Sequence, residues 1–304
     1  AYFPYSTLEK LPDYYYSNVY KFRFISRDAL VWFFEQFNAV FSSLNPTLKE
    51  YASQYGTPFY HSFFLFNAFF LVFTSWCLSE IFALKTFAKT SEVVKIIIHT
   101  LILLLISITC YVLTPYDSPA LFLFAITVFF TLKYFEERKP QQLIIISALI
   151  FISTLNRETS SLNIAFLGAL FLNKEILKKE KLQKFIRIIA LPVFAFLLAY
   201  ISVRIFMKTD EATVSEGIYL VQNLTKPNNI LGILFFIIFI RWSQKISSSQ
   251  QNIGKISAFL LLCSPYLLMI LMVGILWEIR LFIPIVFGMI LLSQMNFEED
   301  TKMD

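Results

Sequence analysis

A polar stretch, Leu-Asn-Arg-Glu-Thr-Ser-Ser at 155–161, interrupts a long apolar run near the middle of the chain. Apolar residues dominate 143–155 before it and 162–172 after it, and two opposite charges, Arg157 and Glu158, stand between them. Placing an arginine or a carboxylate at membrane depth costs about 2.5–3.5 kcal/mol on insertion scales. Charges between two apolar half-helices therefore usually line a polar cavity or mark a bend at a membrane face. The alternative is a tight hairpin whose charges are simply hydrated.

The composition of the whole chain is typical of a membrane protein. Of its 304 residues, 57% are hydrophobic and 15% are charged, whereas soluble domains carry about 25% charged residues. Long apolar runs alternate with short basic loops, without the two-residue alternation of a β-barrel. The sequence therefore predicts an all-α, polytopic membrane helix bundle. The net charge of +5 is then explained by basic loops on one side of a membrane, not by nucleic-acid binding.

The apolar runs predict about nine membrane spans, several of them short or broken. The predicted spans are 60–84, 93–113, 119–135, 141–155, 159–172, 185–206, 230–240, 256–276 and 281–295. Several are shorter than the roughly 20 residues that an isolated crossing needs, so they require local thinning of the bilayer or shelter by neighbouring helices. The predicted division is an external or interfacial segment at 1–58, a transmembrane domain at 59–296 and a tail at 297–304.

The N-terminal segment is rich in tyrosine and is not a predicted span. Its residues 28–44 carry apolar side chains at helical spacing, which predicts an amphipathic helix lying in the membrane interface. Because the sequence starts at Ala1 and not at methionine, we expect that a signal peptide or a leading transmembrane helix precedes it.

The distribution of basic residues predicts the orientation. Most of the 26 Lys and Arg residues fall in 85–95, 133–140, 173–187 and 241–255, which alternation places on one side of the membrane. The positive-inside rule makes that side cytoplasmic. The C-terminal tail is then cytoplasmic and residues 1–58 face outward, and the expected location is a bacterial inner (cytoplasmic) membrane.

The same alternation brings polar residues from several separate turns to the outer side. These residues are Tyr116, Asp117, Asn156, Arg157, Glu158, Arg204, Glu278 and Arg280. Carboxylates act as general bases, and arginine forks bind phosphate through two hydrogen bonds. A helix that starts near Thr159 adds backbone N–H groups that favour anions. This combination at the outer lipid boundary predicts a site for a lipid-phosphate substrate.

Three short motifs carry a resemblance. Tyr116-Asp117 after a span, Asn-Arg-Glu-Thr-Ser at 156–160 between two short helices, and Trp-Glu-Ile-Arg-Leu-Phe-Ile-Pro at 277–284 resemble a set of bacterial multi-pass membrane proteins. The layout of those proteins is similar to that of GT-C-type glycosyltransferases, which use polyprenyl-phosphate-linked sugars. The resemblance covers roughly residues 110–290 and implies a GT-C-like fold and inverting sugar transfer from a lipid-phosphate donor.

The resemblance also implies a catalytic carboxylate. In GT-C enzymes this group lies in the first external loop, where it deprotonates the acceptor hydroxyl. By position, Asp13 or Glu9 corresponds to it, although neither belongs to an Asp-x-Asp pair. Asp13 is the first candidate base, with Asp117 and Glu158 as rivals.

The remaining outer residues are expected to bind the substrate. Arginines would stabilise the departing lipid phosphate, and Glu278 would orient Arg280. The expected substrate-binding residues are Tyr116, Asn156, Arg157, Arg204, Glu278 and Arg280. Ion pairs among them that merely neutralise buried charge are an equally expected arrangement.

No spacing of His, Cys or carboxylates predicts a metal site, and no cofactor is expected. The expected partners are membrane lipids and a lipid-linked phosphate substrate. Two other functions fit the same pattern. A transporter or flippase of a lipid-linked or anionic substrate also binds anions at broken helices, and a non-catalytic membrane subunit would carry such a site within a larger complex of protein subunits.

Overall fold

A computed structural model of the protein describes residues 6–109, 114–172, 179–207 and 218–297, and all regular elements within these ranges are helices. Parts of the predicted features lie outside the described residues. These parts are the start of the N-terminal segment at 1–5, the end of the second predicted span at 110–113, the middle of the basic loop at 173–178, and the tail at 298–304.

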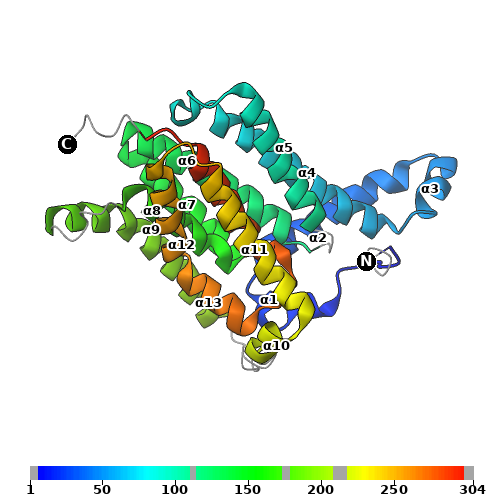
Figure 1. Ribbon diagram of the computed structural model, residues 1–304. Helices are drawn as coiled ribbons and strands as arrows, with labels where there is room; N and C mark the ends of the chain where they lie inside the picture. Colours follow the sequence, from blue (N-terminus) through cyan, green and yellow to red (C-terminus); the bar gives the residue numbers. More distant parts are fainter. Residues whose placement is uncertain (1–5, 110–113, 173–178, 208–217, 298–304) are drawn as a thin grey trace.

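The helices follow one another with short connections (Figure 1). In chain order the elements are η2 (Asp13–Tyr16), α1 (Asn18–Lys21), α2 (Phe24–Ser43), α3 (Pro46–Ser53), α4 (Pro58–Phe82), η3 (Lys85–Phe87), α5 (Glu92–Thr109), α6 (Asp117–Glu137), α7 (Pro140–Asn156), η4 (Glu158–Ser160), α8 (Ser161–Phe171), α9 (Lys179–Phe206), α10 (Leu220–Thr225), α11 (Pro227–Lys245), α12 (Gln250–Leu262), α13 (Ser264–Val273), η5 (Ile279–Leu281) and α14 (Ile283–Gln294), where η denotes a short 3-10 helix.

A helix occupies each stretch that was predicted to cross the membrane, but only some are long and apolar enough to do so. Helices α4, α5, α6 and α9 meet that condition. Helices α12 and α13 count as a further candidate if the pair, bent by 49° at its break, is one broken span. The other helices are shorter or less apolar. The described residues thus hold four candidate spans, or up to five, and the prediction of about nine spans, several of them short or broken, is not confirmed.

Helix α14 explains why a strongly apolar segment need not cross a bilayer. All its residues from Ile283 to Ser293 are buried, and it packs against α5, α8, α11 and α12. A helix that is apolar on all sides is stable at the centre of a protein as well as in lipid. Because its 12 residues rise only about 18 Å, neighbouring helices provide its apolar surroundings.

The predicted amphipathic helix is present but begins four residues earlier, at Phe24 of α2. It packs against α4 and α7, with Leu30 fully buried and Trp32 and Val40 on the exposed face. Helix α3 continues from α2 to the edge of the molecule, on the opposite side of the view from α8 and α9 (Figure 1).

The contacts at one end of the bundle differ in chemistry from those at the other end. Helix α6 ends where Glu136 accepts a hydrogen bond from the Thr86 amide at 2.7 Å. At the same end the Thr86 carbonyl accepts from the Asn296 amide at 2.8 Å, and Asn252 Nδ2 donates to the Leu292 carbonyl at 2.8 Å. One of these hydrogen bonds has a carboxylate acceptor and the other two join neutral groups. Together they link α4, α6, α12 and α14. The opposite end, where α6 begins and α7 and α9 end, is ionic and is called the charged end below.

Candidate functional site

Asp117 lies at the centre of the charged end. It stands in the first turn of α6, where Thr114 Oγ1 donates to its Oδ2 at 2.8 Å. Arg157, which ends α7, donates to Oδ1, and Arg280 Nη1 donates to Oδ2 at 2.7 Å. The Asp117 side chain is only 6% exposed. One carboxylate therefore joins three segments that lie 40 and 163 residues apart in the chain.

Arg280 connects Asp117 to a second carboxylate. Its Nη2 and Nε donate to Glu278 Oε2 at 3.0 and 3.3 Å. The predicted role of Glu278 as a group that orients Arg280 therefore has a geometric basis. Both residues belong to the turn that leads through η5 into α14.

Glu158 holds a second pair of arginines. Arg23 Nη2 and Nε donate to Glu158 Oε2 at 3.1 and 3.3 Å, and Arg204 Nη2 lies 3.5 Å from Oε1. Each oxygen of this carboxylate thus faces a guanidinium group from a different helix end. Arg204 also lies over the ring of Tyr200 at 3.4 Å from its centroid and over that of Phe22 at 5.0 Å.

Arg23 is the site residue that the sequence analysis missed. It belongs to the N-terminal segment and reaches Glu158 across 135 positions of sequence. The available signal was weak: an arginine within a tyrosine-rich stretch, with Tyr20 three residues before it. The Arg23 guanidinium lies 5.5 Å from the ring centroid of Tyr20 and 5.6 Å from that of Tyr116. Cation–π contacts of this kind favour a partly dehydrated charge.

Tyr116 and Asn156 are uncharged residues that lie beside these arginines and carboxylates. The Tyr116 ring stacks on Tyr20 at 5.8 Å and contacts the edge of Tyr15 at 5.6 Å. Asn156 Nδ2 donates to the Tyr116 carbonyl at 3.3 Å. The Tyr116 hydroxyl and Asn156 Oδ1 are buried without a hydrogen-bond partner among the described residues. Buried polar atoms nearly always bind a protein group, an ordered water or a ligand.

The cluster carries an excess of positive charge. It contains the guanidinium groups of Arg23, Arg157, Arg204 and Arg280 and the carboxylates of Asp117, Glu158 and Glu278. Burial lowers the pKa of Arg157, and the nearby positive charges of Arg23 and Arg280 lower it further. Arginine nevertheless stays protonated in proteins. Guanidinium groups held this close together favour the binding of an additional anion.

Neither Asp117 nor Glu158 has a carboxylate oxygen free for proton transfer. Both Asp117 oxygens accept from arginines, and both Glu158 oxygens face arginines. Burial alone raises the pKa of Glu158, but the charges of Arg23, Arg204 and Arg157 and a backbone hydrogen bond outweigh it, so that the pKa lies below its ordinary value. A general base works best with a pKa near the working pH. The geometry therefore favours the positioning of arginines as the role of both carboxylates.

This pKa shift predicts an acid-sensitive contribution of Glu158 to stability. A carboxylate with a lowered pKa stabilises the fold above its unfolded-state pKa, and the contribution is lost as the pH falls through the folded-state pKa. We expect Glu158→Gln to lower the free energy of unfolding by about 2 kcal/mol at pH 7. The difference from the unchanged protein should shrink as the pH falls below about 4, toward the lowered folded-state pKa.

The measurement is thermal unfolding of the detergent-solubilised protein at pH 7 and at a pH below about 4. The matched control is Glu35→Gln, since Glu35 lies on the exposed face of α2. A Glu158→Gln variant whose deficit is equally large at both pH values would contradict the ion-pair assignment.

Asp13, the first candidate base, lies outside this network. It begins η2, its side chain is 90% exposed, and it forms an ion pair at 3.5 Å with Lys10, which is also exposed. Two residues later, Tyr15 packs on Tyr116. The structure thus brings Asp117, Glu158 and all the expected substrate-binding residues into contact with one another in two linked groups, and leaves Asp13 exposed with Lys10.

The turn that carries Glu278 and Arg280 is held by buried asparagines. Asn223 Nδ2 donates to the carbonyls of Leu271 and Gly274 at 2.9 and 2.8 Å, and its Oδ1 accepts from the Leu276 amide at 3.3 Å. Asn229 Oδ1 accepts from the Trp277 amide at 3.2 Å. Helices α10 and α11 therefore supply the hydrogen bonds that the irregular backbone at 274–278 would otherwise lack.

Among the described residues, no group of three or more His, Cys, Asp or Glu side chains has an arrangement that would hold a metal ion. The site is instead defined by arginines, carboxylates, tyrosines and an amide. Searches against protein-family models, curated proteins and solved structures find no match to this chain.

Proposed function

We propose that this protein is a membrane glycosyltransferase that transfers a sugar from a lipid-phosphate donor to an acceptor on the outer face of the membrane. The observation that carries the proposal is the convergence of Arg23, Arg157 and Arg280 at one end of an apolar helix bundle, in a cluster with more guanidinium groups than carboxylates. Arginine binds phosphate through paired, charge-assisted hydrogen bonds. The apolar helices beside it suit a lipid tail.

In this proposal the arginines stabilise the leaving group. As the acceptor oxygen forms its bond to the anomeric carbon, the bond between that carbon and the phosphate oxygen breaks, and negative charge develops on the departing lipid phosphate. Guanidinium groups already held in place by Asp117 and Glu158 stabilise this charge without reorganisation. The acceptor proton passes to a carboxylate. The candidate is the exposed Asp13, which forms an ion pair with Lys10 and contacts no arginine among the described residues.

The position of the charges supports this function over transport. Transporters of the broken-helix type bind their substrate near the bilayer midplane, whereas the arginines here gather where α6 begins and α7 and α9 end. The saturation of Asp117 and Glu158 by arginines favours a second candidate, a subunit that binds lipid phosphate without reaction. Asp13→Asn separates the two: an enzyme loses transfer while it keeps lipid binding, and a binding subunit is unchanged.

Lipid binding is the most direct test. We expect the protein in lipid nanodiscs to bind a polyprenyl phosphate and not the corresponding polyprenol, as measured by native mass spectrometry. Arg23→Gln and Arg280→Lys should each weaken binding about tenfold or more, because each removes a charge-assisted hydrogen bond or the guanidinium fork. Arg280→Lys retains the positive charge beside Asp117, so its folding is preserved.

The matched control is Arg241→Gln, since Arg241 is exposed on α11 near the opposite end of the bundle. Equal binding of the phosphate and the alcohol, or an Arg241 variant as weak as the Arg280 variant, would remove the proposal. Movement of a fluorescent polyprenyl phosphate between the leaflets of liposomes, without chemical change, would support a transporter.

A further inference from the structure

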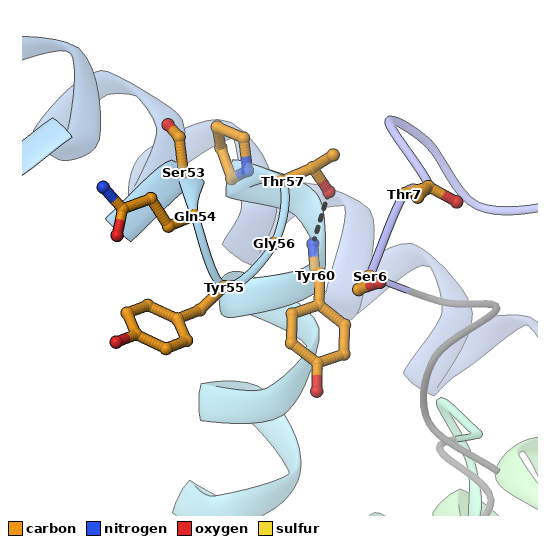
Figure 2. Close-up of a pocket in the computed structure, with 9 residues that line it drawn as sticks. Ser6, Thr7, Ser53, Gln54, Tyr55, Gly56, Thr57 and Tyr60 are labelled. Atoms are coloured by element: carbon orange, nitrogen blue, oxygen red, sulfur yellow. Dashed lines mark hydrogen bonds between the residues drawn. The ribbon is translucent and has the colours of Figure 1, made fainter. Parts of the chain in front are cut away.

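A concave site lies on the N-terminal side of α4, outside the arginines and carboxylates of the charged end. It has a volume of about 600 Å³, within the range of about 300–1,000 Å³ that is typical of small-molecule sites. Figure 2 shows the side chains that surround it. The lining residues are Ser6, Thr7, Ser53, Gln54, Tyr55, Gly56, Thr57, Pro58 and Tyr60.

The lining has a distinct chemical character. None of its side chains is a lysine, arginine, histidine, aspartate or glutamate. Hydroxyl and amide groups alternate with two tyrosine rings, and Tyr55 is 60% exposed. In Figure 2 the rings of Tyr55 and Tyr60 project to the same side of the loop at 53–57. Such a surface offers flat aromatic faces together with neutral donors and acceptors.

Hydrogen bonds hold the two walls of the cavity together. The Thr57 amide donates to the Ser6 carbonyl at 2.9 Å, and Thr57 Oγ1 donates to the Leu8 carbonyl. Thr57 Oγ1 also accepts from the Tyr60 amide at 3.1 Å as the N-cap of α4 (Figure 2). Thr57 thus connects the N-terminal segment at 6–8 to the α3–α4 loop, so the shape of the cavity does not depend on a bound ligand.

Gly56 explains the placement of Tyr60. It has φ +156°, in a region that residues with a side chain rarely adopt, and a Cβ atom at this position would lie 2.5 Å from the Tyr60 ring. The glycine therefore allows the ring to lie against the loop backbone. The aromatic wall depends on this one residue.

We propose that this cavity binds a neutral saccharide. Sugar rings present an apolar face that packs on tyrosine and a rim of hydroxyls that exchange hydrogen bonds with polar side chains such as those of Ser53 and Gln54. A lining without charged side chains offers no counter-ion to an acidic or basic sugar. Phe59 and Phe63, in the first turns of α4 beside the cavity, belong to the same hydrophobic cluster as Tyr116 of the charged end. In a sugar transferase such a site would receive the acceptor, although saccharide binding itself is independent of that function.

The test uses the full chain in nanodiscs and saturation-transfer NMR. The probes are glucose, galactose, N-acetylglucosamine and their disaccharides, with glucuronic acid and glucosamine as charged counterparts. We expect at least one neutral probe to bind at millimolar concentration. Gln54→Ala and Tyr55→Ala should weaken that binding about two- to tenfold, the loss expected for one hydrogen bond or packing contact, and Gly56→Ala should weaken it through displacement of Tyr60.

The matched control is Trp32→Ala, which removes an equally exposed aromatic ring of α2 outside the lining. Arg280→Lys is expected to bind neutral saccharides normally, so failure of the lipid-phosphate proposal and failure of this one are separate results. The proposal is overturned if no neutral probe binds, if the charged sugars bind better, or if Gln54→Ala and Tyr55→Ala bind like the Trp32 control.

Discussion

Replacement of Asp117 by alanine is expected to lower the free energy of unfolding by about 3–5 kcal/mol, as for other buried ion pairs that lose one partner. The Asp117 carboxylate accepts from Arg157 through one oxygen and from Arg280 through the other. Without it, the mostly buried guanidinium group of Arg157 loses its ion pair, and that of Arg280 keeps only its contact with Glu278. Chemical or thermal unfolding of the protein in detergent measures the loss.

Asp13→Ala is the matched control for this prediction. Asp13 and its partner Lys10 are both largely exposed, and exposed pairs contribute at most about 1 kcal/mol. A double-mutant cycle gives a sharper result. Because Asp117 and Arg280 are in direct contact, Asp117→Ala combined with Arg280→Met should be less destabilised than the sum of the single variants. If Asp117→Ala unfolds like the control, the charged end is hydrated and the cluster has no structural role.

Gly232→Ala is expected to be the second strongly destabilising change, by about 3 kcal/mol. A methyl group on Gly232 of α11 would overlap the carbonyl oxygen of Leu276. That oxygen belongs to the backbone of the turn held by Asn223, so it cannot rotate away as a flexible side chain would. Helix α11 must move off the turn, and the turn carries Arg280. The variant should therefore lose polyprenyl-phosphate binding as well as stability.

Gly254 provides a control of opposite sign. It lies inside α12, and a Cβ atom there would meet nothing within 4 Å. Alanine stabilises a helix interior relative to glycine by up to about 1 kcal/mol, so Gly254→Ala should raise the unfolding midpoint. Unfolding curves of the two variants, measured side by side, test the prediction. Equal unfolding midpoints would mean that α11 is not in close contact with the 274–278 turn.

Both predictions concern the position of the turn that carries Arg280. Asp117 draws Arg280 toward α6 by charge, and Gly232 lets α11 hold the turn of Arg280 by close packing. Buried ion pairs often contribute little net stability because dehydration offsets the attraction. A charged ligand at this end, as in the proposed function, would account for their presence in a mostly apolar bundle.

The sequence was sufficient to predict the helices and most residues of the cluster, but it missed Arg23 and put the exposed Asp13 first among the candidate bases. Apolar runs depend only on local order, so each predicted span contains all or part of at least one helix, and the break at Arg157 and Glu158 separates α7 from α8. Alternation of those runs was also enough to expect Asp117, Arg157 and Arg280 at one end, since consecutive antiparallel helices place every second turn on the same side. Their contacts agree with that expectation.

The tertiary structure alone decided which charges pair and which helices are enclosed. Arg23 pairs with Glu158 across 135 positions, and no local pattern encodes a distance in space between segments so far apart. The rotation of each helix about its axis, set by packing, decides that Asp13 stays exposed while Asp117 is buried. The same packing encloses α14, whose sequence resembles a membrane span because burial in protein and burial in lipid select the same apolar residues.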